Sequence, residues 1–305
     1  MALSIHHGSA EYSGPDCVLT IGNFDGVHIG HQALIQKNLA KAKTLGLAST
    51  IFTFEPHPRV VLQPDNHPPR ILSLKDKLSL IEQLGVDHVV VEPFDKVFSM
   101  HPAHWFAQEI VAKRMRSKAM IVGHDFRFGK GRGGNAEVLG QLLPNIPIES
   151  LNAIKIGEDI ASSSRIRERV ATGDVEGAKS LLGRPYWIHG QVVTGAGRGK
   201  QLGFPTANLD IHSELIPARG VYAVEVDHLE KRHRGVANLG LRPTFGKHAF
   251  CMEVHLLDFN QDLYGEELSV RFIQHIRPEC SFDSADALSA QIQQDIKSAK
   301  KILAS

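Results

Sequence analysis

Residues 17–45, CVLTIGNFDGVHIGHQALIQKNLAKAKTL, decide how the first half of the chain folds. The apolar run Cys17–Ile21 predicts a buried strand, and Asn23–Gly30 has the composition of a turn. The segment His31–Leu45 then carries apolar residues at helical spacing, which predicts an amphipathic helix. The residues on its apolar face are Leu34, Ile35, Leu39, Ala42 and Leu45. A strand that leads through a turn into a helix is the basic unit of an α/β fold.

The same strand–helix pattern continues outward from this segment to about residue 151. Further strands are expected at Ser49–Phe54, His88–Val91, Ala119–Val122 and Ile148–Leu151, and further helices at Leu74–Leu84, Pro102–Met115 and Glu137–Leu143. Repeated units of this kind predict a Rossmann-like, doubly wound parallel sheet with helices on both faces. Ligands of such sheets bind at the carboxyl ends of the strands. The segment Glu55–Arg70 holds five prolines and is expected to be a loop.

The pattern changes after about residue 183. Two short helices are expected at Ser162–Ala171 and Val175–Leu182. Short strands then follow at Trp187–Val193, Val221–Val226, Val236–Leu239, Met252–Leu257 and Leu268–Ile273, before one C-terminal helix. Short strands at modest spacing predict a small β-barrel. We therefore expect two domains, residues 1–183 and 184–305.

Composition excludes several classes of protein. Thirty-four Lys and Arg against 33 Asp and Glu give the 305 residues a formal charge of +1, so overall charge offers no argument for binding nucleic acid or an anionic membrane. Three widely spaced cysteines form neither a disulfide framework nor a cysteine zinc site. No apolar run approaches the roughly 18 residues of a membrane span, and the N-terminus lacks a secretion signal. These features lead us to expect a cytoplasmic protein.

The turn GNFDGVHIGH, residues 22–31, is the first candidate site. It joins a strand end to a helix start, where free N–H groups and the positive end of the helix dipole attract anions. His28 and His31 are three residues apart, so both can lie on one face and donate to phosphate oxygens. Phosphate binding is the interpretation we favour. A pair of helix-capping histidines, or half of a metal site, is the alternative.

Two other segments of the first half were weighed as anion sites. In SSSRIR, residues 162–167, three hydroxyls open a helix and two arginines follow, although an ordinary serine cap with exposed arginines explains the same pattern. The segment GKGRGG, residues 129–134, matches the dinucleotide-binding fingerprint by letter only. The fingerprint requires the strand to run directly into the first glycine, and here HDFRF intervenes. A mobile basic loop is the better interpretation.

The stretch VTGAGRGKQLGFPTANL, residues 193–209, is the richest of the second half. It is not a Walker A loop, but its glycines allow the backbone to approach phosphates. Thr206 and Asn208 offer oxygen ligands on one side of an extended segment, which suits Mg²⁺. A hairpin loop with glycine turns is an equally good interpretation. Glu253, on the strand after it, is of interest only as a base beside such a phosphate loop.

The chain as a whole resembles the bacterial bifunctional riboflavin kinase/FAD synthetase family. The resemblance is carried by ten segments in order: TIGNFDGVHIGHQ, FEPHP, VGHDFRFG, SSSRIR, LLGRPY, GFPTANL, GVYAVEV, GVANLGLRPTF, EVHLLDF and DLYGEEL. It implies an N-terminal FMN adenylyltransferase domain, which forms FAD and pyrophosphate from FMN and ATP, and a C-terminal riboflavin kinase domain, which forms FMN. It also implies Mg²⁺ in both reactions. The implied partners are riboflavin, FMN and ATP, without nucleic acid or membrane, and no oligomeric state is implied.

In the first half, the resemblance assigns His28 and His31 to the ATP phosphates as catalytic residues. The remaining residues that it assigns to the nucleotide there are Gly22, Asn23, Asp25, Asp125, Ser163, Ser164 and Arg167. Asp125 would contact the phosphate of nucleotide or flavin, and the two serines with Arg167 would close on the triphosphate. Ser164 stands where relatives usually have threonine, which keeps the hydroxyl.

In the second half, the resemblance makes Thr206 and Asn208 the ligands of Mg²⁺–ATP and Glu253 the catalytic base. Gly195, Gly199 and Gly203 would line the nucleotide, and Arg277 would lie on the flavin side. Two alternatives remain open at this stage. One is a flavokinase with an inactive N-terminal scaffold, and the other is a non-catalytic flavin sensor. A dinucleotide-dependent oxidoreductase rests only on the rejected glycine match.

Overall fold

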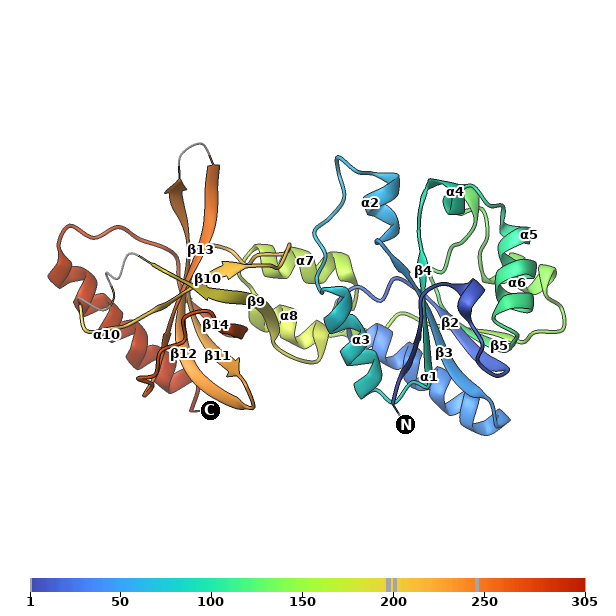
Figure 1. The fold of residues 1–305 in the computed structure, drawn as a ribbon, viewed down its shortest axis with the longest axis horizontal. Coiled ribbons are helices and arrows are strands. Elements are labelled where there is room, and N and C mark those ends of the chain that lie inside the picture. Colours follow the sequence, from blue (N-terminus) through green and yellow to red (C-terminus); the bar gives the residue numbers. More distant parts are fainter. Residues whose placement is uncertain (1, 196–198, 200–201, 245–246, 305) are drawn as a thin grey trace. The chain divides into compact units, whose positions relative to one another are not determined.

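The computed structural model describes residues 2–195, 199, 202–244 and 247–304, and it divides into two compact units, Met1–Ser163 and Ser164–Ser305 (Figure 1). Helix α8 (Val175–Leu182) packs against strands β9 (Tyr186–Val193) and β14 (Glu267–Arg277) of the second unit. Almost all of α7 (Ser163–Ala171) belongs to that unit as well. The domain boundary between residues 183 and 184 stays a prediction.

The first unit is built on a parallel sheet of six strands in the order β1-β4-β3-β2-β5-β6. Its strands are β1 (Ser4–His6), β2 (Cys17–Ile21), β3 (Ala48–Glu55), β4 (His88–Pro93), β5 (Ser117–Gly123) and β6 (Ile148–Leu151). The chain moves from β2 through β3 to β4 on one side, and then returns to β5 and β6 on the other. The predicted doubly wound sheet is therefore confirmed.

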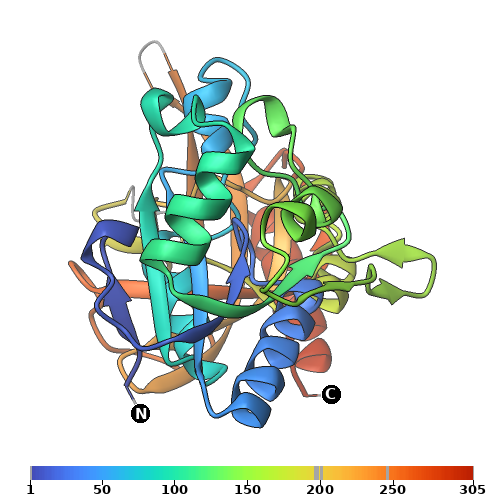
Figure 2. The same ribbon diagram turned by 90° about the vertical axis from the view of Figure 1, so that its right-hand side faces the viewer.

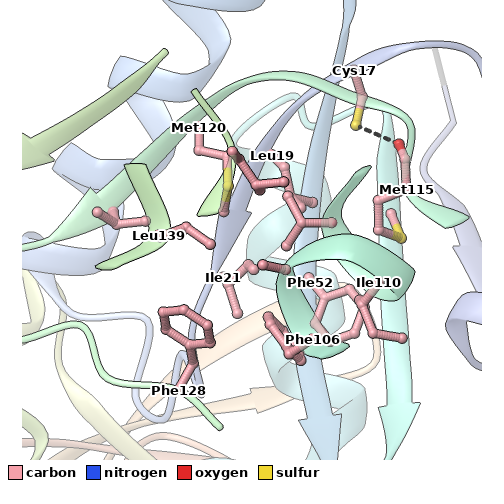
Figure 3. Close-up of a cluster of buried hydrophobic side chains, with 14 of the residues drawn as sticks. Cys17, Leu19, Ile21, Phe52, Phe106, Ile110, Met115, Met120, Phe128 and Leu139 are labelled. Atoms are coloured by element: carbon pink, nitrogen blue, oxygen red, sulfur yellow. Dashed lines mark hydrogen bonds between the residues drawn. The ribbon is translucent and has the colours of Figure 1, made fainter. Parts of the chain in front are cut away.

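Helices cover both faces of this sheet, and the alternation along β2 shows which helices lie on which face. The helices are α1 (Ile29–Leu45), α3 (Leu74–Gln83), α4 (Lys96–Ser99), α5 (Ala103–Trp105), the π-helix η2 (Phe106–Arg114) and α6 (Ala136–Leu142). Cys17, Leu19 and Ile21 are packed with residues of η2 and α6 in one buried apolar cluster, where the Cys17 thiol donates to the carbonyl of Met115 (Figure 3). The side chain of Thr20 faces the other way, because it accepts a 2.9 Å hydrogen bond from Asn38 of α1.

The proline-rich segment after β3 differs from its prediction as a loop. It contains the short helix α2 (Pro58–Leu62), with His57 as the N-cap that accepts a 3.1 Å hydrogen bond from the N–H of Arg59. Proline is tolerated at the first helical position because the N–H that it lacks has no helical partner there. The expected helix Pro102–Met115 is realised as α5 followed by the wider turns of η2, which begins at Phe106.

The short strand β1 and a small hairpin were not predicted from the sequence. β1 is only three residues long and adds to the edge of the sheet beside β4, with Ser4 opposite His88. A hairpin of β7 (Lys155–Ile156) and β8 (Asp159–Ile160) extends outward from the first unit (Figure 2). Such short strands carry too few residues for an alternation of apolar and polar side chains to be recognised.

The second unit contains the predicted closed barrel, with strand order β10-β13-β12-β11-β14-β9. Beside β9 and β14, its strands are β10 (Ala207–Ile211), β11 (Gly220–His228), β12 (Lys231–Thr244) and β13 (Lys247–Leu256). Leu209, Met252 and Val254 are fully or almost fully buried, and they alternate with more polar neighbours that face outward. Helix α10 (Ala285–Ile302) packs through Ala299 and its apolar neighbours on the outer face of β11, β12 and β14 (Figure 1).

Candidate active sites

The turn that follows β2 lies at the switch point of the sheet. β2 has β3 as its neighbour on one side and β5 on the other, and the direction of strand connection reverses between them. In parallel sheets, this is the place where the loops after two neighbouring strands separate and leave a crevice for a ligand. Gly22 and Asn23 follow β2, and Asp125 is an exposed residue in the loop after β5. The structure thus places the Gly22–His31 turn and Asp125 at the edge expected for a ligand.

The backbone of this turn is strained. Phe24 and Val27 have φ angles of 50° and 38°, and Gly26 between them has a φ of 88°. A left-handed backbone is costly for a β-branched residue such as Val27, and it persists only where surrounding contacts impose it. The contacts are present here, because the side chains of Phe24 and Val27 are almost completely buried. Strain of this kind concentrates at functional sites.

Side chains from three segments donate hydrogen bonds to carbonyl groups of the turn. The hydroxyl of Thr53 donates to the carbonyl of Asn23 over 3.2 Å, and the hydroxyl of Ser163 donates to the carbonyl of Asp25 over 2.9 Å. The amide of Gln32 donates to the carbonyl of Val27 over 2.9 Å. The turn is therefore fixed by β3, by α1 and by the segment that leads into α7.

Asp25 anchors the turn through its side chain as well. Its Oδ1 accepts hydrogen bonds from the N–H groups of Ile71 and Leu72, at 3.0 and 3.4 Å, and only 4% of the residue is exposed. The carboxylate thus ties the turn to the segment before α3. A direct contact between Asp25 and nucleotide stays a prediction.

His28 and His31 are brought together as the sequence predicted. Their rings are stacked, with centroids 3.6 Å apart and planes 21° apart. His28 is also the N-cap of α1, because its Nδ1 accepts a hydrogen bond from the N–H of His31 over 3.3 Å. An accepting Nδ1 places the proton of a neutral ring on Nε2, so His28 offers a donor on its other edge. A Cβ on Gly30 would lie 3.1 Å from the His28 ring, which explains the glycine between the two histidines.

The remaining residues predicted for this site are only partly brought to it. Ser163 contacts the turn directly. Ser164 and Arg167 lie on α7 and belong to the second unit, so their approach to a triphosphate stays a prediction. The mobile basic loop expected at residues 129–134 contains one short 3₁₀ turn, Lys130–Arg132.

An aromatic cluster near the same sheet edge was not predicted. Phe54 at the end of β3, Phe94 just after β4 and Phe98 of α4 form a triangle of rings with centroids 5.5 to 6.1 Å apart. Trp105 contacts Phe98 and is stacked on His101, with 3.6 Å between those two ring centroids. Phe54, Phe94 and Phe98 are half-buried. The repeated phenylalanines at strand ends were the available signal in the sequence.

In the barrel, two of the predicted kinase residues, Asn208 and Glu253, lie in one row across neighbouring strands, and Thr206 directly precedes β10. Asn208 of β10 is the direct partner of Glu253 of β13, and Glu253 is in turn the partner of Asn238 of β12. Their sequence neighbours Leu209 and Met252 are buried, so the row lies on the outer face of the barrel. Asn208 is nevertheless only 6% exposed, which shows that this part of the outer face is covered.

Two of the predicted glycines lie close to Asn208 and Thr206. A Cβ on Gly195 would overlap the side-chain amide of Asn208, and a Cβ on Gly199 would lie 3.0 Å from the Thr206 hydroxyl. Gly203 has a φ of 83°, where residues other than glycine are strained. Glycine is thus favoured beside both Thr206 and Asn208. Residues 196–198 and 200–201 of the same stretch lie outside the described residues.

Arg277 has a strong partner within the barrel unit. Its guanidinium makes hydrogen bonds of 2.8 to 3.1 Å to both carboxylate oxygens of Asp295 on α10, and this carboxylate raises the pKa of Arg277. The guanidinium of Arg277 also donates to the carbonyl of Pro278 and contacts the Cys280 sulfur. These contacts join β14 to α10. A contact between Arg277 and flavin stays a prediction.

The described residues contain no group of three or more His, Cys, Asp or Glu side chains that could hold a metal ion. The oxygen donors Thr206 and Asn208 are of a different kind, and they suit a hard cation that retains water and phosphate ligands. No helix in the described part of the chain is long and apolar enough to cross a membrane.

A strained turn at the switch point of a parallel sheet, followed by a closed barrel with a carboxylate on a strand beside an amide side chain, is the architecture expected of a two-domain transferase that uses ATP. Family models match both parts. Residues 11–165 match the model described as FAD synthetase, and residues 182–303 match the model described as riboflavin kinase. The chain belongs to the bifunctional riboflavin kinase/FMN adenylyltransferase family.

Similar proteins support this assignment over nearly the full chain. A bifunctional riboflavin kinase/FMN adenylyltransferase of Escherichia coli is 40% identical over 298 residues, with 97% of this chain and 95% of the relative covered. The enzyme of the same name from Haemophilus influenzae is 38% identical, with 97% of this chain and 96% of the relative covered. The one from Bacillus subtilis is 37% identical, with 91% of this chain and 90% of the relative covered. A solved structure from Streptococcus pneumoniae, described as a macrolide-efflux protein, is 31% identical with a TM-score of 0.90, and covers 98% of this chain and 99% of its own. The two-domain architecture is thus shared with a solved structure.

The protein is a transferase with riboflavin kinase and FMN adenylyltransferase activities, so flavins are its substrates and products and ATP is its co-substrate. The resemblance drawn from the ten sequence segments is confirmed. The flavin sensor and the oxidoreductase are not supported.

Proposed function

We propose that adenylyl transfer takes place at the Gly22–His31 turn, and the observation that supports this most is the strained turn with two stacked histidines at the start of α1. An oxygen of the FMN phosphate attacks the α-phosphorus of ATP. The new P–O bond forms as the bond to pyrophosphate breaks, so no protein nucleophile is needed. The protein supplies position and charge stabilisation, for which imidazole N–H donors and a helix N-terminus are suited.

Within this site, His28 presents its Nε2–H to the phosphate oxygens, while its Nδ1 remains the cap of α1. Gly22, Asn23 and Asp25 shape the turn, and Asp125 approaches from the loop after β5. Ser163, Ser164 and Arg167 act on the triphosphate. The half-buried Phe54, Phe94 and Phe98 offer apolar ring faces near the same edge, which suit the planar flavin.

Phosphorylation of riboflavin takes place at the row on the barrel. Glu253 takes the proton of the flavin hydroxyl while the hydroxyl oxygen attacks the γ-phosphorus of ATP, and ADP leaves. A carboxylate helps here because the attacking hydroxyl is neutral, whereas the attacking phosphate in the other reaction already carries charge. The pairing of Asn208 with Glu253 across two strands supports this assignment most strongly.

The residues around Asn208 fit a magnesium ion bound with ATP. Thr206 and Asn208 carry oxygen donors, and Gly195 and Gly199 approach them so closely that a Cβ on either glycine would crowd the donor side chain. When bound, Mg²⁺ offsets the charge of the phosphates. Gly203 allows the chain to turn into the ligand-bearing segment. Arg277 lies on the flavin side by analogy with relatives.

The protein acts on riboflavin, FMN and ATP, and we propose the cytoplasm as its compartment. Its cysteines Cys17, Cys251 and Cys280 are not in disulfides. Free thiols are typical of a reducing compartment.

Incubation of the full chain with riboflavin, ATP and Mg²⁺, with riboflavin, FMN and FAD resolved over time, tests both assignments together. FMN should appear first and FAD after it. If FMN accumulates without FAD, and a parallel incubation that starts from FMN also forms no FAD, the first unit is not active. The protein would then be a flavokinase with an inactive N-terminal scaffold. Flavin binding without any conversion would contradict both sites.

A further inference from the structure

Asn238 is an exposed amide side chain near the centre of strand β12. Its neighbours Ala237 and Leu239 are completely buried, so Asn238 points to the outer face of the barrel. Asparagine is depleted in β-strands, and departures from such local preferences concentrate at functional positions. The place of Asn238 on the barrel indicates which function this position serves.

The register of the barrel places Asn238 directly beside the proposed catalytic base. Asn238 pairs with Glu253 of β13 on one side and with Val221 of β11 on the other. Val221 pairs in turn with Arg277 of β14, the residue proposed for the flavin side. Directly opposite residues of antiparallel strands have Cβ atoms roughly 4.5–5.5 Å apart, so the Asn238 amide lies within reach of a group bound at the Glu253 carboxylate. Asn238 therefore lies between the base and the residue proposed for the flavin side.

The positions around Asn238 on the outer face are covered, whereas Asn238 itself is exposed. Val236, two residues before it, and Val221 pack in one apolar cluster with residues of α10 and its C-terminal end. Gly240, two residues after it, is buried, and a Cβ there would lie 2.5 Å from Oε1 of Glu279 in the segment between β14 and α10. Asn238 is therefore a single accessible polar position with covered neighbours along its strand, and not part of an open polar surface.

The chemistry of riboflavin phosphorylation gives a reason for an amide at this position. Riboflavin carries its reacting hydroxyl at the end of a flexible chain that bears several other hydroxyls, and only the terminal one is to face the base and the γ-phosphorus. Holding the chain beside the base converts random encounters into a reactive arrangement. An amide donates and accepts hydrogen bonds, as a chain hydroxyl does. The two groups are therefore matched.

We propose that Asn238 is a substrate-binding residue of the riboflavin kinase site, which holds a hydroxyl of the ribityl chain next to the hydroxyl that reacts. The inference rests on the proposed roles of Glu253 and Asn208. It gives Asn238 a part in substrate specificity as well. A site built to bind a substrate hydroxyl discriminates against a chain that lacks the hydroxyl.

The test compares riboflavin with a synthetic flavin that carries an unbranched hydroxypentyl chain, which keeps the terminal hydroxyl and lacks the others. Asn238→Ala should lower kcat/KM for riboflavin about tenfold, the order of magnitude of one hydrogen bond. It should leave kcat/KM for the hydroxypentyl flavin within about twofold, since the lost partner is absent there. The preference for riboflavin, taken as the ratio of the two kcat/KM values, should therefore fall about fivefold or more, while KM for ATP stays at the parent value.

Two further variants separate this role from a structural one. Arg234→Ala is the matched control, because Arg234 is exposed on the same strand and the same face as Asn238. It should keep the parent preference. Asn238→Val removes the amide but suits a β-strand better, so it should lower the preference as Asn238→Ala does, and it decides if the alanine variant fails to fold by circular dichroism. A folded Asn238 variant with the parent preference overturns the inference, and so does one that raises only KM for ATP.

Glu253→Gln, assayed with riboflavin in parallel, distinguishes failure of this inference from failure of the proposed site. If Glu253→Gln phosphorylates riboflavin at the parent rate, the row on the barrel is not the kinase site, and the role of Asn238 is wrong as well. If Glu253→Gln is inactive while Asn238→Ala keeps the parent preference, only the role of Asn238 is wrong.

Discussion

Asn208 and Glu253 are direct partners across β10 and β13, and both lie on the outer face of the barrel. The pairing brings an amide oxygen that can hold a cation and a carboxylate that can hold a proton onto neighbouring positions of two antiparallel strands. Directly opposite residues in such a pair have Cβ atoms roughly 4.5–5.5 Å apart. In the proposed reaction, a phosphate bound through a metal ion at Asn208 and a riboflavin hydroxyl beside Glu253 would therefore lie close together.

Replacement of Glu253 by Gln should lower kcat of riboflavin phosphorylation by about 10²–10⁴-fold, because the amide keeps the shape of the side chain and cannot take a proton. The measurement is FMN formed from riboflavin under saturating ATP. FAD formation from added FMN should be unchanged. Glu267→Gln is the control, since Glu267 is an exposed carboxylate on β14. A Glu253→Gln variant with the parent kcat would remove Glu253 from the chemistry.

Replacement of Asn208 by Ala should raise the Mg²⁺ concentration needed for half-maximal kinase activity by about tenfold or more, since one oxygen ligand is lost. The Mg²⁺ dependence of adenylyl transfer should not move, which makes the first unit the control within the same molecule. The experiment is a Mg²⁺ titration of both activities at fixed ATP. Equal Mg²⁺ curves for parent and variant kinase would reject the ligand assignment.

Replacement of His28 by Asn should abolish most adenylyl transfer while riboflavin phosphorylation continues. Asparagine is a good N-cap, so α1 keeps an acceptor for the N–H of His31, but the ring donor is lost. A loss of about 10²–10³-fold is typical when one donor to a developing charge is removed. Rates of FAD formation from FMN and the thermal unfolding midpoint are measured together. Equal loss of both activities in a folded variant would argue against two separate sites.

Removal of the Asp295 carboxylate should destabilise the barrel unit. Asp295 is almost fully buried and accepts from Arg277 of β14 and from Gln291 of its own helix. Asp295→Ala leaves the arginine without its partner, and the expected cost is about 3 kcal/mol of unfolding free energy. Urea unfolding monitored by circular dichroism measures this cost. Asp286→Ala, in the exposed first turn of α10, should cost less than about 1 kcal/mol; a similar loss in both variants would contradict a special role for the Arg277–Asp295 pair.

The sequence predicted most of the fold because apolar strands and amphipathic helices alternate along the first half and short strands follow in the second. Val175–Leu182 and Ile148–Leu151 were predicted with the bounds that the structure shows, and Cys17–Ile21 likewise. The exceptions are local. The helix at Pro58–Leu62 was hidden by its neighbouring prolines, and the three residues of β1 pair only because β4 offers a free edge.

The candidate sites were predicted less completely, since their geometry depends on contacts distant in sequence. The spacing of His28 and His31 anticipated a shared helix face, but not that His28 caps the helix. The alternation of residues around Glu253 did not predict that Asn208 is its cross-strand partner. The register between strands whose residues are 45 positions apart is set by the closed barrel.

Stability of the first unit should fall as the pH decreases below about 6.5, because of a histidine pair at the edge of the sheet. Nε2 of His6 lies 3.2 Å from Nδ1 of His88, and the Tyr12 ring packs edge-on against both. Burial, and next the neighbouring His6, lower the pKa of His88 in the folded protein, although Asp87 acts in the opposite direction. The unfolded chain therefore binds the proton more tightly. The contribution of His88 is fully present above its unfolded pKa of about 6.5, and is lost as the pH falls from there through the lower, folded pKa.

The variant His88→Gln should remove this part of the pH dependence, so that unfolding free energies at pH 5 and 7.5 differ less than in the parent protein. The protein has two tryptophans, Trp105 in the first unit and Trp187 in the second. Urea unfolding followed by fluorescence in a Trp187→Phe background therefore reports on the first unit. His104→Gln is the control, since His104 is exposed on α5. A His88→Gln protein with the same loss of stability at pH 5 as the control would contradict the lowered pKa of His88 as the source of this pH dependence.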